Sequence, residues 1–160
     1  MSTFLIIVIC VALFAAAFYF GKQREDRLIS EGKIIKREAD FYKYAEVFTV
    51  NGLNFGDILS EVGNTDYSEM KVAIHKFASE IVFKSNDSWN AKLSNLGENN
   101  GKNRFRFEFS AWTESKYGVP YGIQTMNMME TKIEKMFLKH DESTGVEKEE
   151  IKLKTKHKFF

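Results

Sequence analysis

The run FLIIVICVALFAAAFYF at residues 4–20 contains no charged or strongly polar side chain. As an α-helix it is roughly 25 Å long, which is close to the minimum needed to cross the hydrocarbon core of a bilayer. Tyr19 stands near its downstream end, where aromatic rings favour the membrane–water interface. This feature constrains the chain more than any other, and it predicts a transmembrane anchor over residues 1–21.

A secretory signal peptide is the alternative interpretation of this segment. Such a peptide has a basic start, a shorter apolar centre and a cleavage site between small residues. Here no Lys or Arg precedes the apolar run, and the small residues 15–17 are followed by the apolar residues 18–20. The pattern favours an anchor that is retained, with cleavage after the alanines left open. Cys10, the single cysteine, lies inside the run and is interpreted as a small residue facing lipid.

The basic residues that flank the apolar run indicate its orientation. Lys22, Arg24 and Arg27 follow the run, and none precedes it. By the positive-inside rule, the part of the chain after the anchor lies in the cytoplasm, at the cell membrane. An anchored domain on the outer side, with a role in the cell envelope, is the alternative.

About 140 residues remain after the anchor, which is the usual size of one domain. We expect a helical connector over residues 22–32, ended by Gly32, and a single domain over residues 33–160. The clearest strand is NRFRFEFSAW, where Phe105 and Phe107 share one face and the arginines share the other. Further strands are predicted at residues 33–37, in a segment ending at Val50, at 79–85 and 89–93, and at 149–160, with a loop at 97–103.

Three segments have the spacing of amphipathic helices. A short helix is predicted to start after Asn54, and a second one over residues 67–77, capped by Asp66 or Ser68. The clearest helix covers residues 127–140, with Asn127 as its cap and Glu130 completing a capping box. Its methionines form an apolar stripe, which we interpret as core. These elements predict an α+β fold, in which an N-terminal transmembrane helix precedes a two-layer domain of antiparallel sheet with helices on one face.

The sequence offers no recognisable catalytic, cofactor-binding or metal-ligating motif. His75, His140 and His157 are far apart and have no partner at metal-ligand spacing. With Cys10 assigned to the membrane, no thiol nucleophile remains in the domain. We therefore expect a protein that is not an enzyme and has no cofactor, and we leave open an enzyme whose site is not recognised.

The end of the chain alternates between basic and other residues. As a strand it would place four lysines on one face, about 6.6 Å apart, where they could contact anionic lipid or a protein partner. The alternative is that they protect an exposed edge strand from aggregation. The formal net charge of +1 argues against nucleic acid as a partner. The lysines are Lys152, Lys154, Lys156 and Lys158.

A second candidate contact surface lies on the strand NRFRFEFSAW. Arg104, Arg106 and Trp112 fall on the face opposite the phenylalanines if the strand stays regular. We predict an exposed patch there. Together these features predict a single-pass membrane protein whose domain is a non-catalytic binding module, with the bilayer contacted through residues 4–20 and with an unidentified protein as partner.

Overall fold

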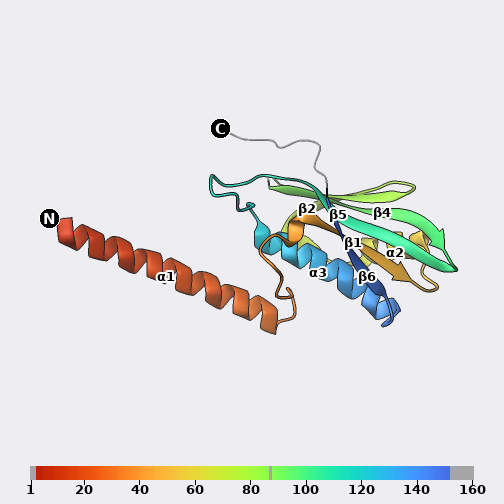
Figure 1. Cartoon of the computed structure of the whole chain (residues 1–160), viewed down its shortest axis with the longest axis horizontal. Coiled ribbons are helices and arrows are strands. Elements are labelled where there is room, and N and C mark those ends of the chain that lie inside the picture. The colour runs from red at the N-terminus through yellow and green to blue at the C-terminus, as the bar shows by residue number, and fades with distance from the viewer. Residues whose placement is uncertain (1–2, 87, 152–160) are drawn as a thin grey trace. The chain divides into compact units, whose positions relative to one another are not determined.

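The computed structural model describes residues 3–86 and 88–151 and is shown in Figure 1. The chain divides into two compact units, Met1–Lys36 and Arg37–Phe160. The first consists of one long helix and a short segment that follows it. The second is an α+β domain.

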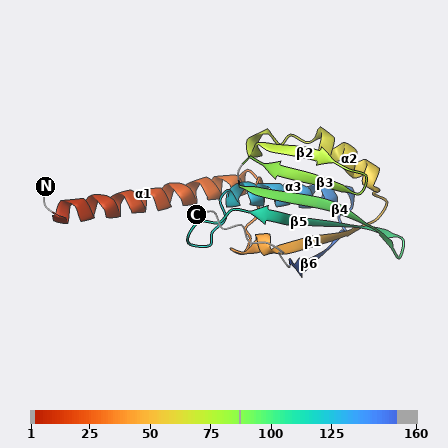
Figure 2. The same cartoon turned by 90° about the horizontal axis from the view of Figure 1, so that it is seen from above.

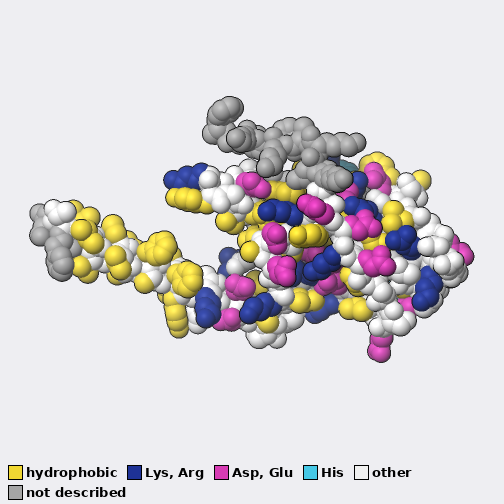
Figure 3. Space-filling model, viewed as in Figure 1, with side chains coloured by type: hydrophobic (Ala, Val, Ile, Leu, Met, Phe, Trp, Pro, Cys, Tyr) yellow, Lys and Arg dark blue, Asp and Glu magenta, His cyan; other side chains and the backbone are white. Residues whose placement is uncertain are grey.

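Helix α1 (Thr3–Ser30) makes up most of the first unit. The stretch Leu5–Ser30 is long and apolar enough to cross a membrane, with a mean hydropathy of 2.3 in its most apolar window, none of which is buried. Figure 3 shows hydrophobic side chains covering the outer part of this helix, whereas the visible face of the domain carries mixed charges. The predicted helical extension beyond the apolar run is therefore confirmed.

Gly32 ends α1 as predicted. Its φ of 66° is a left-handed conformation that favours glycine. The N–H of Gly32 donates to the carbonyl of Ile29 at 2.9 Å, and the N–H of Lys33 donates to that of Leu28 at 2.8 Å. The strand predicted at residues 33–37 is wrong, because part of this segment hydrogen-bonds back to the helix end and no strand pairs with it.

The domain is built on a six-stranded sheet with the order β2-β3-β4-β5-β1-β6. Every neighbouring pair is antiparallel. Four consecutive strands form a meander, and β1 inserts between β5 and β6, with Phe48 opposite Phe105 and Glu46 opposite Phe107. The strands are β1 (Tyr44–Val50), β2 (Val72–Lys76), β3 (Glu80–Ser85), β4 (Trp89–Asn99), β5 (Lys102–Trp112) and β6 (Gly145–Glu150).

Two helices, α2 (Phe55–Asn64) and α3 (Ile123–His140), lie on one face of the sheet, as the views in Figures 1 and 2 show. Short 3-10 turns, Phe41–Lys43 and Ser68–Met70, precede β1 and β2. The predicted two-layer α+β fold with helices on one face is confirmed.

The core lies between the sheet and the helices. The ring of Phe137 from α3 stacks on Phe48 of β1 and on Phe105 of β5, with centroid distances of 4.4 and 5.4 Å. The fully buried methionines of α3 confirm its stripe as core. The largest fully buried side chains are Phe48, Phe83, Phe105, Phe107, Phe109, Phe137, Ile58, Ile81, Leu93, Met126, Met129 and Ile133.

Helix α2 begins where the sequence predicts it. The side chain of Asn54 accepts a hydrogen bond from the N–H of Asp57 at 3.1 Å, and the carboxylate of Asp57 accepts one from the N–H of Asn54 at 3.0 Å. This reciprocal capping box satisfies two backbone donors that the helix leaves unpaired.

The helix predicted over residues 67–77 is wrong. Only the turn Ser68–Met70 is helical, and Val72–Lys76 pairs with β3 as strand β2. The β-branched residues Val72 and Ile74 suit a strand, and pairing with β3 outweighs the helical spacing of the apolar residues. The loop predicted at residues 97–103 is also too long, because β4 and β5 continue to a tight hairpin at Asn100 and Gly101.

Helix α3 starts earlier than predicted. Its N-cap is Gly122, and Ile123 is its first residue, so Asn127 lies within the helix and does not cap it. The predicted capping box of Asn127 and Glu130 is therefore wrong. The last strand, β6, ends at Glu150. The four lysines of the predicted basic strand, Lys152, Lys154, Lys156 and Lys158, lie outside the described residues, as does His157.

Candidate functional site

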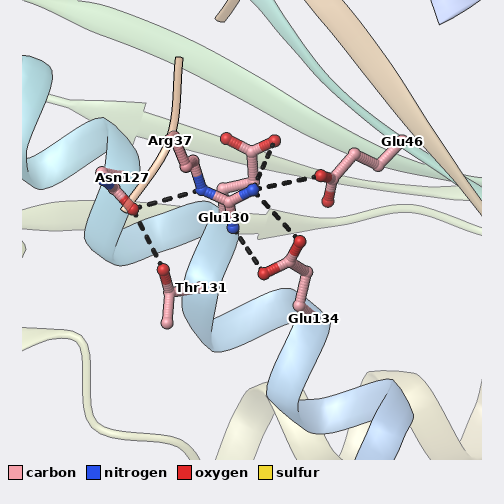
Figure 4. Close-up of polar contacts among 6 residues, drawn as sticks. All are labelled: Arg37, Glu46, Asn127, Glu130, Thr131 and Glu134. Atoms are coloured by element: carbon pink, nitrogen blue, oxygen red, sulfur yellow. Dashed lines mark hydrogen bonds and ion pairs between the residues drawn. The ribbon is translucent and has the colours of Figure 1, made fainter. Parts of the chain in front are cut away.

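A cluster of charged side chains lies between β1, α3 and the segment that enters the domain (Figure 4). The guanidinium of Arg37 is at its centre. Nη1 and Nη2 of Arg37 donate to the two carboxylate oxygens of Glu134 at 3.1 and 2.5 Å, and Nη1 also donates to Glu46 at 3.2 Å. Nη1 lies 3.6 Å from a carboxylate oxygen of Glu130. We call the residues Arg37, Glu46, Asn127, Glu130, Thr131 and Glu134 the Arg37 cluster.

Polar side chains of α3 complete the cluster. Nε of Arg37 donates to Oδ1 of Asn127 at 3.2 Å, and the hydroxyl of Thr131 donates to the same oxygen at 3.1 Å. Glu130 and Thr131 are three and four residues after Asn127, and Glu134 is four and three residues after them, which puts all four on one side of α3. Glu46 comes from the centre of β1, on the sheet face that α3 covers.

The cluster is enclosed. The side chains of Arg37, Glu46 and Glu130 are 6%, 1% and 3% exposed. Glu134, at 15%, is the one most open to water. One guanidinium therefore faces three carboxyl groups inside the domain, and full ionisation would leave an excess of negative charge where water does not screen it.

This excess shifts the proton affinities of two carboxyl groups. Burial, together with the charge of Glu134, raises the pKa of Glu46 to about 7 against the lowering effect of Arg37. Burial, together with the charge of Glu46, raises the pKa of Glu130 to about 9 against the same effect of Arg37. For Arg37, burial acts to lower the pKa, but the hydrogen bond to Glu134 and the charges of the three carboxylates outweigh it and raise the pKa.

Two carboxyl oxygen atoms of the cluster lack a hydrogen-bond partner. Among the described residues, these are the buried atoms Oε2 of Glu46 and Oε2 of Glu130. Protonation of either carboxyl group supplies a donor that the other can accept, and the side-chain hydrogen bond with Glu46 contributes to the raised pKa of Glu130. The raised pKa values of Glu46 and Glu130 therefore favour the protonated form within this pair of carboxyl groups.

This arrangement connects three elements. Arg37 fastens the start of the domain to β1 and to α3 at the same time. Within the described residues, no group of three or more His, Cys, Asp or Glu side chains has the geometry of a metal site, and the guanidinium occupies the centre of the carboxylates. The hydrogen bonds of Arg37 therefore make the cluster an internal clamp between the start of the domain, β1 and α3.

This cluster is not among the sites predicted from the sequence, in which Glu130 is expected to cap a helix. One signal was present. Glu130 sits among Met126, Met129 and Ile133, all buried, so a carboxyl group occupies the apolar side of the helix. Glu46 likewise interrupts the apolar strand YAEVFTV. Two acids at positions that face a core indicate a buried cation between them.

The predicted patch of Arg104, Arg106 and Trp112 lies along β5. Arg106 bonds to Glu108 at 2.9 Å and to Glu149 of β6, and Arg104 lies 3.9 Å from Glu147. Lys92 of β4 pairs with Glu108 at 2.8 Å. Burial alone would raise the pKa of Glu108, but the hydrogen bonds from Lys92 and Arg106 outweigh it and lower the pKa. These residues form a ladder of alternating charges on the sheet face away from the helices.

Trp112 stands at the far end of β5 from the hairpin. Its ring packs on Tyr42 with a centroid distance of 5.0 Å, and its indole N–H donates to Glu114 at 2.8 Å. The structure thus brings Arg104 and Arg106 together with acidic partners and places Trp112 in a separate aromatic contact. His75 is exposed on β2, and His140 ends α3 with its Nε2 3.9 Å from Glu61.

The residues 113–122 connect β5 to α3 and carry exposed aromatic side chains. Tyr117, Val119 and Tyr121 are 80%, 51% and 56% exposed, whereas Pro120 is buried. We call this segment the 113–122 loop.

Comparison with known proteins adds no family to this description. No family model matches the chain, and neither the curated proteins nor the solved structures include a significant match. The protein is therefore defined by its structure, as an α+β domain that follows a long apolar helix.

Proposed function

We propose that this protein is a single-pass membrane protein whose α+β domain is held at the membrane surface by α1 and acts there by binding a partner, without catalysing a reaction. The observation that carries the proposal is α1 itself. Its apolar stretch is long enough to cross a bilayer and is not buried against the rest of the chain. An exposed apolar helix of this length is unfavourable in water and favourable in lipid.

A binding role agrees with the charged groups that the domain displays. The two carboxyl groups with strongly raised pKa values, Glu46 and Glu130, are the side chains best suited to general acid or base catalysis. A catalytic acid must reach a substrate, and both side chains are closed to solvent, at 1% and 3% exposure. The charge ladder on the sheet offers a broad polar surface, which suits contact with another protein.

An enzyme is the second candidate, because perturbed carboxyl groups are common at active sites. It requires that α3 and β1 separate so that substrate reaches Glu130. Under the binding proposal the cluster stays closed, and a water-soluble carbodiimide should modify Glu130 no faster than the domain unfolds. Modification of Glu130 in the folded protein would favour the enzyme.

The anchor can be tested by extraction of membranes from cells that make the full chain. The wild-type protein should stay in the pellet after alkaline carbonate treatment, and a variant with Leu13→Arg and Phe14→Arg should move to the supernatant, because charges at the centre of a membrane helix are costly. Intact mass measurement of the pelleted protein distinguishes an anchor from a cleaved signal sequence. Loss of the first residues from the mature chain would reject the anchor.

The side of the membrane can be tested with a single cysteine in the hairpin. In a Cys10→Ser background, Asn99→Cys places a thiol at the exposed end of β4. We propose a cytoplasmic domain, because Lys22, Arg24 and Arg27 follow the apolar run. A membrane-impermeant maleimide should then label the thiol only after cells are opened. Labelling of intact cells would place the domain outside, in the envelope role that is the alternative.

A further inference from the structure

The 113–122 loop presents exposed apolar and aromatic side chains. Among the described residues, Tyr117 is the most exposed large hydrophobic side chain, at 80%, and Val119 and Tyr121 in the same loop are 51% and 56% exposed. Nζ of Lys116 lies 5.0 Å from the centroid of the Tyr117 ring. Exposed aromatic side chains gathered in one short loop indicate a contact surface.

The backbone of this loop is held in shape by its own hydrogen bonds. The N–H of Ser115 donates to the carbonyl of Val119 at 2.8 Å, and the N–H of Tyr121 donates to that of Thr113 at 2.9 Å. Gly118 closes the turn with a φ of 76° and donates to the carbonyl of Ser115 at 2.9 Å. A loop with internally paired backbone groups can enter a medium poor in water at lower cost than an open loop.

The chain enters the domain close to this loop. The segment from Arg37 leads to Tyr42, whose ring packs on Trp112 and whose hydroxyl donates to the carbonyl of Gly118 at 3.5 Å. Arg37 itself bonds to Asn127, near the start of α3, which directly follows the loop. The loop and the entry point therefore lie at the same end of the domain.

The connection to α1 is short. Residues 31–36 alone separate the end of α1 from Arg37 and span at most roughly 20 Å. The part of α1 beyond the apolar run, residues 21–30, is roughly 15 Å long. The headgroup layer on one side of a bilayer is about 5–7 Å thick. The entry end of a domain tethered this way is within reach of the interface.

We propose that the 113–122 loop inserts Tyr117, Val119 and Tyr121 into the interfacial layer of the bilayer that α1 crosses, so that the domain touches the membrane at a second place. Tyrosine rings favour this layer because they have an apolar body and a polar tip. Lys116 lies beside them, where its ammonium group meets lipid phosphates. The inference rests on the proposed anchor, since without a membrane-spanning α1 no bilayer is held near the end of the domain that carries the loop.

Fluorescence quenching by lipid tests the inference on the full chain in phosphatidylcholine vesicles. The fluorophore is attached to one cysteine in each of three proteins. The native Cys10 reports on the anchor. Val119→Cys and Leu96→Cys, each with Cys10→Ser, report on the loop and on the opposite end of the sheet. Position 96 is a matched control for position 119, since Val119 and Leu96 are 51% and 47% exposed. Two lipid quenchers are used in separate samples. The shallow one carries a nitroxide near the headgroup, and the deep one carries it in the acyl chain.

The inference predicts that the shallow quencher reduces the fluorescence at position 119 at least about twofold more than at position 96, because side chains that insert at the membrane surface lie about 5–10 Å deep, at the boundary of headgroups and acyl chains. Substitution of Tyr117 and Tyr121 by Ser should return the signal at position 119 to that of position 96. Quenching at Cys10 by a nitroxide deep in the acyl chain, with equal signals at 119 and 96, would overturn the inference and leave the anchor in place.

Other outcomes separate the remaining explanations. Absence of deep quenching at Cys10 would reject the anchor and, with it, the loop insertion. The fluorophore at position 119 could also be protected from a water-soluble quencher in detergent, to a degree that rises with protein concentration. This result would show that a second copy of the chain covers the loop, and it would overturn the inference.

Discussion

Arg37 is the residue on which the buried polar structure of the domain depends. It faces three carboxyl groups and is 6% exposed. Because removing one partner from a buried ion cluster leaves the others uncompensated, Arg37→Met should lower the free energy of unfolding by about 3–5 kcal/mol. Urea titration of the full chain in detergent, followed by the fluorescence of buried Trp89, measures this loss.

Two other substitutions test whether the loss of stability in Arg37→Met comes from the buried ion pairs. Arg37→Lys keeps the charge but not the paired donors and should cost less than Arg37→Met. Arg106→Met removes an arginine that is 24% exposed, and it should cost no more than about 1 kcal/mol. Equal costs at positions 37 and 106 would contradict the clamp.

Glu130 makes the stability of the domain depend on pH. Its folded pKa, about 9, lies above its ordinary value of 4.5, so the protonated carboxyl is the form that folding favours. Its contribution to stability is complete below pH 4.5 and is lost as the pH rises through 9. Glu130→Gln should remove this loss, making the variant more stable than the wild type at about pH 9, by on the order of 1–3 kcal/mol.

The control for this prediction is a carboxyl group with the opposite shift. The pKa of Glu108 is lowered, so Glu108 adds stability above its ordinary pKa, and this contribution is lost as the pH falls. Glu108→Gln should therefore be less stable than the wild type at neutral pH and should converge with it in acid. Urea titrations across the pH range compare the two variants, and a wild-type curve that rises towards pH 9 would contradict the assignment of the proton to Glu130.

For single residues, sequence patterns predict whether a side chain is buried better than they predict which partner it contacts. The alternation in β5 placed the phenylalanines in the core correctly. The same reasoning gave Glu130 a capping role, because a cap and a buried acid look alike when the partner is far away in the sequence. Arg37 lies 97 residues from Glu134, and only the folded chain brings them together.

At the scale of elements, α2 depends on its cap. Asn54→Ala removes the hydrogen bond to the N–H of Asp57 and should lower the free energy of unfolding by about 1 kcal/mol. Ser60→Ala in the same helix is the matched control. The hydroxyl of Ser60 only donates to the carbonyl of Gly56 on an exposed surface, so its loss should stay within about 0.5 kcal/mol. Thermal or urea unfolding of both variants measures the difference.

The start of α3 depends on a glycine. Gly122 has a φ of 72°, and a Cβ there would lie 2.9 Å from Oγ of Ser88 and 3.3 Å from Cδ1 of Trp89. Gly52 has a similar φ of 67° with nothing within 4 Å. Gly52→Ala should therefore show only the cost of the left-handed backbone, roughly 1–2 kcal/mol, and Gly122→Ala should cost clearly more. Equal urea midpoints for the two variants would contradict a close contact at Gly122.

Whole elements were predictable where local pattern and tertiary pairing agree. β5 and α2 have strong periodicity or a complete cap, and both were predicted. The segment 67–77 was predicted as a helix because its apolar residues are spaced for one, yet pairing with β3 makes part of it a strand. The 113–122 loop carries no periodic signal, so its exposed aromatic side chains could be recognised only in the structure.

At the scale of the whole molecule, the chain passes from the first unit to the second between Lys36 and Arg37. Lys36 is exposed, whereas the side chain of Arg37, the next residue, is enclosed in the cluster. Trypsin should therefore cut the full chain in detergent after Lys36 and not after Arg37, because cleavage requires an accessible, unpaired side chain. Mass spectrometry of the first fragments identifies the bond. Lys36→Gln should slow the cut, and cleavage after Arg37 in the wild type would contradict the enclosure of its side chain.

The α+β class of the whole molecule was predictable because turns, periodicity and the apolar first segment all point to it. The position of β1 between β5 and β6 was not. Strand order is decided by packing over long separations, and the segment YAEVFTV does not specify its neighbours.

That position has a consequence for synthesis on the ribosome. β1 leaves the ribosome about 60 residues before β5 is complete, which at about 5–20 residues per second is a delay of roughly 3–12 s. The meander β2 to β5 forms from neighbouring hairpins, but β1 has no strand to pair with during this interval. In the nascent chain Glu46 is solvated and ionised, and a charge in the middle of an apolar strand discourages pairing with other chains. The carboxyl group of Glu46, which is buried in the folded domain, thus protects β1 from aggregation until β5 has been synthesised.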